Sequence, residues 1–476
     1  TRKEIPSLIE ALRDEIGIYL QDLELVLFKE LRKAFAQAFR QVLEHLDIVI
    51  RDKRDPRFEV KERVGTTLET LLGVQVSFKR RRYNDTVTGD SVYLLDEVLG
   101  MVEGTQTSPA LVKLMLHLAM MMSYRDAEES LEQFYGYRPV CHETIRQVVL
   151  KTGKALEEIN EEKLRNPQGK RKADLIFVEA DGLHVSLQNE KRRSIEEFSA
   201  TIHEGWEPRT PGSKDFKLVN PNLYRTQQGA DFWEQASRYI YSIYDIDDDT
   251  TVVINGDRAS WIRQGIDYFP KAIYQVDRYH LKRDIRNIFG KDSKVTVELF
   301  QALDSTDVTG STFLAKLAEA KLRLRDSDKA KDCQRLLNDL TDIPEATVDY
   351  RRRLKALNRP VESLRGLGAG ESQMSRYSQR VKGKRSWKPE GLGAMMEVLA
   401  WQYGERMNEF NHRISEVLNH VEFTPLAVKN IVKKAVRKVA GVNRWNAGVP
   451  IKHAGRTWSS GISNLMHRLN ESGMPI

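Results

Sequence analysis

Apolar residues recur every three to four positions along residues 5–49 of the chain. This spacing places them on one face of an α-helix and leaves the opposite face polar. We therefore predict one long amphipathic helix or a helical hairpin, and we assign residues 1–56 to a segment that packs or dimerises.

The pattern changes to an alternation of apolar and polar residues in FEVKERV and GVQVSFKRRRYND, which lie within residues 57–105. A period of two is typical of strands that bury one face. The second strand carries Arg80, Arg81 and Arg82 shortly before a turn at TGD, so we predict a basic β-hairpin. Its arginines would bind a DNA backbone or, equally well, form a charged edge strand that resists aggregation.

Helical signals dominate residues 106–172. The segment SYRDAEESLEQFYG begins with Ser123 as a helix cap, has Asp126 three residues later and stops at a glycine. A second helix is predicted over CHETIRQVVLKTG, before a charged helix and linker. This spacing is that of a helix-turn-helix, whose second helix would present Arg146 and Gln147 to DNA bases. A helical hairpin without DNA contacts fits the same pattern.

Strongly apolar strands mark residues 173–290. ADLIFVEADGLHVSLQ is predicted to form two strands joined at Gly182, and FSATIHEGW a third. Helices then alternate with the strands TTVVINGD and AIYQVD, which gives the order β-β-β-α-β-α-β-α. Three antiparallel strands followed by alternating strands and helices are the order of an RNase H-like mixed sheet.

The rest of the chain is predicted to form three regions. Residues 291–365 are helical and highly charged, and we interpret them as an all-α insertion into the sheet domain. Residues 366–404 return to that domain through GLGAG, and residues 405–476 form a basic C-terminal tail. The predicted fold class is therefore multidomain α+β: N-terminal helical and helix-turn-helix regions, then an RNase H-like mixed sheet interrupted by helices.

Composition narrows the class of protein. The chain has 476 residues, of which 40% are apolar, so several folded domains are expected. The two cysteines, Cys141 and Cys333, form neither a disulfide framework nor a zinc-ligand cluster, which fits a reducing compartment. The longest apolar run, LVKLMLHLAMMM, is too short to span a bilayer, so we expect a cytoplasmic protein without a membrane partner.

Positive charge is concentrated near the C-terminus. Residues 423–470 contain nine Lys and Arg and no Asp or Glu, and residues 375–388 contain six more without an acid. Because these charges exceed the net charge of +7, the remainder of the chain is net negative. This distribution predicts a surface that binds a polyanion such as DNA, although solvated basic helices fit it too. The residues expected to contact DNA there are Arg376, Arg380, Lys384, Arg385, Lys433, Lys434, Arg437 and Lys438.

Two aspartates lie on strands that the predicted order makes adjacent. Asp181 is on the first strand and Asp257 ends the fourth. Neighbouring buried carboxylates repel each other unless a cation lies between them, although a single strand-end aspartate also commonly caps the next helix. Carboxylate oxygens suit Mg²⁺ or Mn²⁺, and a pair of such ions supports phosphodiester chemistry. That chemistry needs a third acid downstream, and Glu371 opens a predicted helix after a glycine-rich stretch.

Several motifs resemble those of the ISLre-type bacterial insertion-sequence transposases. The specific blocks are FVEADG and GAGESQMSRYSQRVKGKRSWKPEGLGAMM, together with VVINGDRASWI and YQVDRYHLKRDI. RRRYNDTVTGDSVYLLDEVLG and SYRDAEESLEQFYGYRPVCHETIRQVV extend the resemblance over about residues 60–400. It implies a DDE transposase with an RNase H-like domain split by a helical insertion, and it maps the catalytic and metal-binding trio onto Asp181, Asp257 and Glu371.

The resemblance implies partners and a location. We expect double-stranded DNA, namely the terminal inverted repeats of an element and its target, and a homodimer or higher homo-oligomer on that DNA. The chain would be a bacterial cytoplasmic protein associated with the nucleoid when bound to DNA, and Trp387 would stack on a flipped or distorted base. Two alternatives stay open: a non-catalytic, domesticated DNA-binding protein, and an RNase H-like nuclease without strand transfer.

Three further features bear on the site. Glu179 shares a strand face with Asp181 and is a candidate auxiliary acid, whereas we expect Asp277 to cap the helix that follows it. The C-terminal segment RTWSSGISNLMHRL repeats RSWKPEGLGAMMEVL in outline but has no acid nearby upstream. This second copy is therefore expected to bind a polyanion without supplying a metal ligand.

Overall fold

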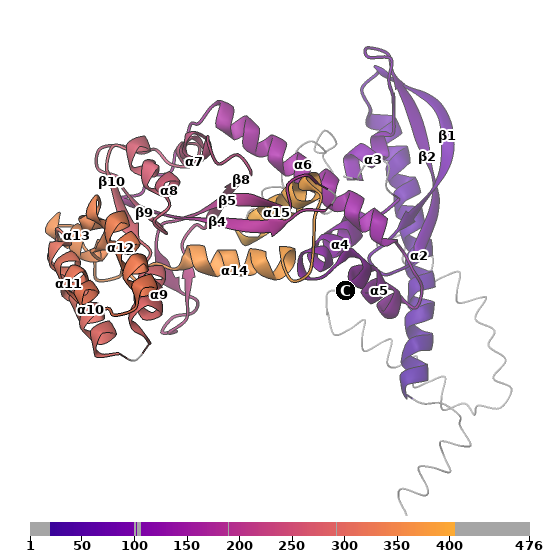
Figure 1. Cartoon of the computed structure of the whole chain (residues 1–476). Helices are drawn as coiled ribbons and strands as arrows, with labels where there is room; N and C mark the ends of the chain where they lie inside the picture. Colours follow the sequence, from indigo (N-terminus) through magenta and orange to yellow (C-terminus); the bar gives the residue numbers. More distant parts are fainter. Residues whose placement is uncertain (1–19, 100, 102–105, 189, 292, 405–476) are drawn as a thin grey trace, which may run out of the picture. The chain divides into compact units, whose positions relative to one another are not determined.

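The computed structural model describes residues 20–404, apart from residues 100, 102–105, 189 and 292. The described residues divide into two compact units, one up to Pro109 and the other from Ala110 onward (Figure 1). Residues 405–476, which include the predicted basic tail and its repeat, lie outside the described residues.

The described part of the first unit is a helix packed on a hairpin. Helix α2 (Leu20–Lys53) is one continuous helix. It packs on strand β2 (Gln75–Asp85), which pairs antiparallel with β1 (Phe58–Glu69). A short strand β3 (Ser91–Val92) and helix α3 (Leu94–Leu99) complete it. The predicted helix is therefore confirmed as a single helix over the described residues, and the predicted hairpin is confirmed. The core residues are Val42, Leu43, Leu46, Ile50, Leu68, Val76, Phe78 and Leu95.

Three helices open the second unit: α4 (Pro109–Met121), α5 (Tyr124–Tyr135) and α6 (His142–Arg165). The predicted capping box of Ser123 with Asp126 is present at the start of α5. The helix predicted over CHETIRQVVLKTG was expected to end at Gly153. This end is wrong, because α6 continues for another twelve residues beyond it. A Cβ at Gly153 would lie 2.5 Å from the Cα of Ala394, so this glycine allows another helix to pack closely and does not end its own.

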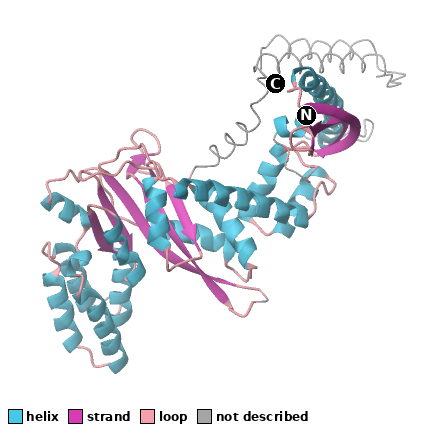
Figure 2. Cartoon of the chain, turned by 90° about the horizontal axis from the view of Figure 1, so that it is seen from above, coloured by secondary structure: helices cyan, strands magenta, loops and turns pink. Residues whose placement is uncertain are grey.

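The second unit contains a five-stranded mixed sheet. The order across it is β10 (Ala272–Val276), β9 (Thr251–Gly256), β4 (Leu175–Ser186), β5 (Ser194–His203) and β8 (Asn222–Thr226). Strand β4 is parallel to β9 and antiparallel to β5; β9 and β10 are parallel, and β5 and β8 antiparallel. A two-stranded ribbon, β6 (Trp206–Pro208) with β7 (Phe216–Leu218), lies between β5 and β8 in the chain. Figure 2 shows the strands together with the surrounding helices.

Two strand predictions are corrected. Gly182 does not join two strands; it lies inside β4 and pairs with Phe198, so one strand covers both predicted ones. The segment predicted as the third strand belongs to β5, the second strand of the sheet. The third is NLYRT, whose five residues are mostly polar and carry too short an alternation to stand out in the sequence.

The two faces of the sheet differ in chemistry. One face is apolar and packs on α7 (Phe232–Tyr241), α8 (Ser260–Arg263) and α9 (Arg278–Phe289). The other face carries buried polar side chains in the strand interiors: Glu179, Glu197, Ser199, Thr201, Asn255 and Gln275. Helix α14 (Ala369–Val381) contacts β4 and β5, and α15 (Pro389–Tyr403) contacts β8 (Figure 1).

The predicted insertion is helical in the structure. Its elements are α10 (Lys294–Ser305), α11 (Ser311–Leu322), α12 (Ser327–Thr341), the 3₁₀ turn η2 (Pro344–Thr347) and α13 (Tyr350–Ala356). Outside the insertion, a 3₁₀ turn η1 (Gln264–Tyr268) precedes β10. Leu299, Phe313 and Leu336 join the same apolar cluster as the helices on the sheet's apolar face. Within the part of the chain that the structure describes, no helix has the length and apolar character needed to cross a membrane.

Candidate active site

The two predicted aspartates lie just beyond the paired stretch of two neighbouring parallel strands, where β9 ends beside the middle of β4. Glu179 of β4 pairs in register with Asn255 of β9, and each aspartate follows two positions later in its own segment. Asp181 still belongs to β4, and its Oδ1 accepts the Gly182 N–H at 2.7 Å. Asp257 directly follows β9, and its Oδ1 accepts a backbone N–H from the start of α8 at 2.8 Å.

Glu371 reaches the same edge from a segment much later in the chain. It lies in the first turn of α14, and its side chain is 49% exposed. Its Oε2 lies 3.1 Å from Nε2 of His280, which occupies the first turn of α9, directly after β10. Histidine therefore joins the acidic site from a fourth segment. In the sequence, only the place of His280 shortly after the predicted strand AIYQVD distinguishes it.

The charges at this edge act on one another. Burial, and after it the charges of Asp257 and Glu371, raise the pKa of Asp181 to about 6, against the opposing effects of the Gly182 N–H and His280. A carboxyl group responds in this way when it is desolvated beside like charges. Asp257 and Glu371 are thus close enough to Asp181 for their charges to shift its pKa.

The carboxylates of Asp181, Asp257 and Glu371 are of the chemical type that a hard divalent cation binds, but they do not enclose a single position. Mg²⁺ and Mn²⁺ take carboxylate oxygens, and a cation would favour the ionised form of Asp181 that its surroundings now disfavour. Within the described residues, however, no three His, Cys, Asp or Glu side chains form a closed set of ligands around one point. The residues present therefore suit such an ion by type, without a preformed cage.

A buried polar network lies directly behind the carboxylates. Glu179 is 2% exposed, and Nδ2 of Asn255 donates both to Glu179 at 3.3 Å and to Asp277 at 3.1 Å. Asp277 caps α9 by accepting the His280 N–H at 2.9 Å, as predicted. Glu179 also accepts backbone N–H groups at the start of α14. Its predicted role as an auxiliary acid is corrected, because donors from the protein already surround its oxygens.

The sequence model described as "Uncharacterised protein family (UPF0236)" matches residues 13–413. The chain belongs to UPF0236. This match includes the whole segment, about residues 60–400, over which the sequence resembles insertion-sequence transposases.

Relatives in the family are similar over most of their length. A UPF0236 protein of Caldanaerobacter subterraneus subsp. tengcongensis is 26% identical over 414 residues, covering 85% of this chain and 82% of the relative. A UPF0236 protein of Streptococcus gallolyticus, described as lying in a vanSb 3′ region, is 27% identical over 394 residues, covering 81% and 83%. A solved Drosophila P element transposase strand transfer complex aligns with a TM-score of 0.20 and 10% identity over 68% of this chain and 91% of that one. A likeness this low carries no argument about the fold.

The predicted DNA contacts after Glu371 separate into exposed and buried residues in this UPF0236 protein. Arg376 and Lys384 are exposed, and Arg385 is partly exposed while its guanidinium donates to carbonyls at the end of α14. Arg380 is only 3% exposed and Trp387 8% exposed. These last two predictions are therefore corrected, because neither side chain is presented to a DNA surface.

Arg380 and Trp387 instead tie α14 to α4 and α5. Arg380 donates to the carbonyl of Ala119, and its guanidinium lies 5.4 Å from the ring centre of Tyr124 and 4.8 Å from that of Trp387. The indole N–H of Trp387 donates to the carbonyl of Val381 at 2.9 Å. Cation–π contacts and a satisfied indole N–H are what a buried structural cluster requires.

The other predicted DNA contacts have partners inside their own unit. Arg146 and Gln147 both donate to Glu143 on the same helix turn, at 2.7 and 2.9 Å. The hairpin arginines pair with acids: Arg80 with Asp96, Arg81 with Asp47, and Arg82 with Glu62. DNA contact by these residues stays a prediction. Lys433, Lys434, Arg437 and Lys438 lie outside the described residues.

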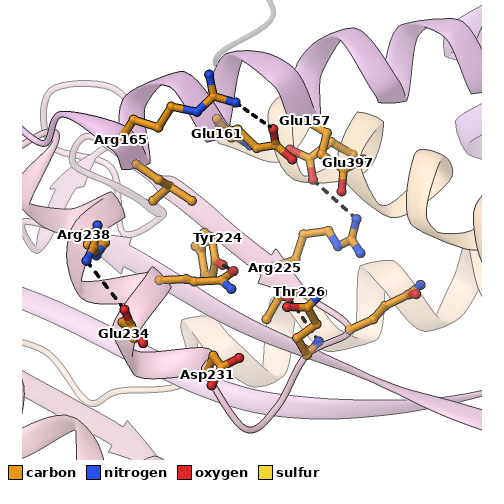
Figure 3. A pocket seen from close by; sticks show the side chains of 15 residues that line it. Glu157, Glu161, Arg165, Tyr224, Arg225, Thr226, Asp231, Glu234, Arg238 and Glu397 are labelled. Atoms are coloured by element: carbon orange, nitrogen blue, oxygen red, sulfur yellow. Dashed lines mark hydrogen bonds and ion pairs between the residues drawn. The ribbon is translucent and has the colours of Figure 1, made fainter.

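The sequence analysis did not predict a second charged region of this UPF0236 protein. It is a cavity of about 640 Å³ lined by α6, β8, α7 and Glu397 of α15 (Figure 3). Arg225 of β8 points toward Glu397 at 3.5 Å and bonds Glu197 of β5 at 3.2 Å. Arg165 and Arg238 pair with glutamates of their own helices. A lone arginine in a short polar strand gives no signal of such a network in the sequence.

Proposed function

We propose that this UPF0236 protein is a DNA transposase of the DDE type, in which Asp181, Asp257 and Glu371 together bind two Mg²⁺ or Mn²⁺ ions. The observation that carries the proposal is the convergence of three carboxylates from distant segments on one sheet edge, where burial and the other two charges raise the pKa of Asp181 to about 6. Like charges held together in this way favour a cation as their partner.

The order of the sheet supports an RNase H-like catalytic domain. Taken in chain order, the first three strands, β4, β5 and β8, are antiparallel neighbours. The fourth strand, β9, lies parallel to the first on its other side, and the fifth, β10, lies parallel to the fourth. This arrangement agrees with the predicted order and brings the end of the fourth strand beside Asp181 of the first.

The chain's own residues would divide the work as follows. Asp181 and Asp257 would hold the ions from the sheet, and Glu371 would complete the set from α14 while His280 orients its carboxylate. When bound, the ions would activate a water or a DNA 3′-hydroxyl and stabilise the leaving oxygen. Exposed Arg376, about one and a half turns beyond Glu371 on the same helix, would bind the DNA backbone.

The names of relatives add independent support. The name of one Caldanaerobacter relative joins eleven designations, and the name of a second joins four. One protein that answers to many designations in one organism is what repeated copying of a gene would produce. For the present chain this supports transposition. The proposed partners are element ends and target DNA, and the proposed assembly on them is a homodimer or larger homo-oligomer.

The test is metal-dependent cleavage by the full chain. The substrates are supercoiled DNA and linear DNA that carries the sequences flanking the gene, with Mg²⁺ or Mn²⁺ added. We expect nicking and strand joining by the wild type. Asp257→Asn is expected to lose both reactions and to retain DNA binding in a mobility-shift assay. Near-normal cleavage by Asp257→Asn would show that the trio is misassigned.

Two other outcomes point to the alternative functions. Salt-sensitive DNA binding without cleavage of any DNA, in either metal, would indicate a non-catalytic DNA-binding protein. Cleavage of RNA or hybrid duplexes without strand joining would indicate an RNase H-like nuclease. Inverted repeats bracketed by a short direct duplication around the gene would favour the transposase over both.

A further inference from the structure

The first turn of α14 is held by a carboxylate from the sheet. Glu179 of β4 accepts the backbone N–H groups of Gly368 at 2.8 Å, Ala369 at 3.0 Å and Gly370 at 3.2 Å. The first N–H groups of a helix have no partner within the helix, and the N-cap here is a glycine that offers no side-chain acceptor. Glu179 therefore supplies, from another element, the cap that the helix itself lacks.

A carboxylate suits this place for two reasons. It can only accept hydrogen bonds, so it matches a cluster of N–H donors, and its charge interacts favourably with the positive end of the helix dipole. Charge-assisted bonds of this kind are stronger than those between neutral groups. Because Glu179 is 2% exposed, water does not compete for its oxygens.

The contact with Glu179 explains why GLGAG contains glycine at two of its positions. A Cβ on Gly370 would lie 3.0 Å from the Cβ of Glu179, so a larger residue there would push the helix away from its anchor. Gly368 has φ 156° and ψ 9°, a backbone conformation that residues with side chains rarely adopt. The glycine-rich stretch before Glu371 is thus fitted to its contact with Glu179.

The anchor belongs to a closed hydrogen-bonded ring. From Glu179 the ring continues through Asn255 to Asp277, whose Oδ1 accepts the N–H of His280 at 2.9 Å. The His280 ring then contacts the carboxylate of Glu371 at 3.1 Å, and Glu371 lies on the helix that Glu179 anchors. Glu371 is therefore held at its backbone by Glu179 and at its carboxylate by His280.

We infer that Glu179 is a positioning residue, which fixes Glu371 relative to Asp181 and Asp257 and so sets the affinity of this site for divalent cations. The inference rests on the proposed function. Glu179 itself does not bind the ion, since its oxygens face the α14 N–H groups, Asn255 and, at 3.3 Å, His203. Losing a residue that orients metal ligands typically lowers metal affinity about 10–100-fold.

The first measurement follows the anchor itself. Hydrogen–deuterium exchange of the full chain is compared for the wild type, Glu179→Gln and Glu179→Asp. In Glu179→Gln, the side-chain NH₂ group would face the backbone N–H groups of α14, and two donors cannot form a hydrogen bond. We therefore expect the backbone amides of residues 368–371 to exchange at least about tenfold faster in that variant. Glu179→Asp keeps the carboxylate and should retain part of the protection. Unchanged exchange in both variants would overturn the inference.

The second measurement is Mn²⁺ binding by the same proteins, using calorimetry without DNA. We expect Glu179→Gln to bind Mn²⁺ about 10–100-fold more weakly and Glu179→Asp to recover part of the loss. Glu128→Gln is the matched control. Glu128 is also buried and accepts the N–H of His142 at the start of α6, but it lies outside the ring. The affinity of this control for Mn²⁺ should equal that of the wild type.

The outcomes separate this inference from the proposed function. Absence of Mn²⁺ binding in the wild type, or full retention of it in Asp181→Asn, would overturn the proposed function whatever the Glu179 variants do. Wild-type Mn²⁺ affinity in Glu179→Gln, with faster α14 exchange, would overturn the inference alone and leave Glu179 a structural role. An equal loss of affinity in Glu128→Gln would also overturn it, because the effect would then follow from general destabilisation.

Discussion

Two charged regions of the second unit differ in how their charge is balanced. At the sheet edge, Asp181, Asp257 and Glu371 bring three like charges together, with His280 as the basic group beside Glu371. In the cavity around Arg225, by contrast, the arginine pairs with two buried glutamates. Unbalanced charge is costly in a fold and is kept where a ligand supplies the opposite charge, whereas balanced charge joins elements.

The direction of the pKa shifts expresses the same difference. Burial and neighbouring acids raise the pKa of Asp181 and so disfavour its charged form. Burial acts to lower the pKa of Arg225, but Glu197, Glu397 and Glu157 reverse this effect, so the pKa is raised and the charged form is favoured. The protein's own groups therefore leave the charge of Asp181 disfavoured, whereas they favour the charge of Arg225.

The largest expected effect comes from removing a charge at the unbalanced edge. Glu371→Gln should lower metal-dependent DNA cleavage about 10³-fold, since metal ions contribute several kcal/mol of transition-state stabilisation. The melting temperature should hardly change, because the side chain is half-exposed. Glu390→Gln, which removes the first-turn acid of α15, is the control and should cleave normally. An equal loss of cleavage in Glu371→Gln and Glu390→Gln would show that Glu371 has no special role in cleavage.

The same chemical change in the balanced region should act on stability instead. Glu197 is fully buried against Arg225, and Glu197→Gln would leave that arginine with a weakened partner. Breaking a buried pair costs about 3–5 kcal/mol, so urea unfolding should show a loss of about 3 kcal/mol. The exposed pair in the same cavity is the control: Glu234→Gln should cost less than about 0.5 kcal/mol. A small loss in both would mean that the buried network does not stabilise the fold.

A third prediction uses the raised pKa of Asp181 in metal-free protein. The folded-state pKa of about 6 exceeds the ordinary value of 3.8, so proton binding stabilises the fold at low pH and this stabilisation is lost as pH rises from about 4 to 6. Asp181→Asn avoids that loss. We expect the variant to gain about 3 kcal/mol over the wild type above pH 6, and almost nothing at pH 4. Thermal melts in a chelator across this range measure the difference; parallel pH profiles would contradict it.

The three candidate acids can be picked out from the sequence more readily than the residues around them, for a physical reason. Asp181 and Asp257 follow from strand ends and strand order, which are local patterns, and Glu371 follows from the resemblance. The role of Glu179 depends on contact with a helix almost two hundred positions later, and no periodicity reports such a contact. The strand β8 was missed because five mostly polar residues carry too little alternation.

Burial of charged residues shows the same limit. Arg376 and Arg380 are four positions apart on α14 and look equivalent in the sequence, since this spacing places both on one side of a helix. In the structure Arg376 is exposed, while α4 and α5 cover Arg380 with the Ala119 carbonyl and the Tyr124 ring. The two arginines differ only in their tertiary packing. They are therefore a matched pair for the prediction on DNA binding, which has the smallest expected effect.

Arg376→Gln should weaken DNA binding a few-fold and leave stability unchanged. An exposed arginine that contacts a phosphate releases about one counterion, so the slope of log affinity against log salt should fall by about 0.9. Arg380→Gln should instead lower the melting temperature and keep the wild-type slope, because its guanidinium is buried among protein partners. Fluorescence anisotropy with one duplex at several salt concentrations measures both slopes. If Arg380→Gln lowers the slope and Arg376→Gln does not, the burial of these residues does not decide which of them meets DNA.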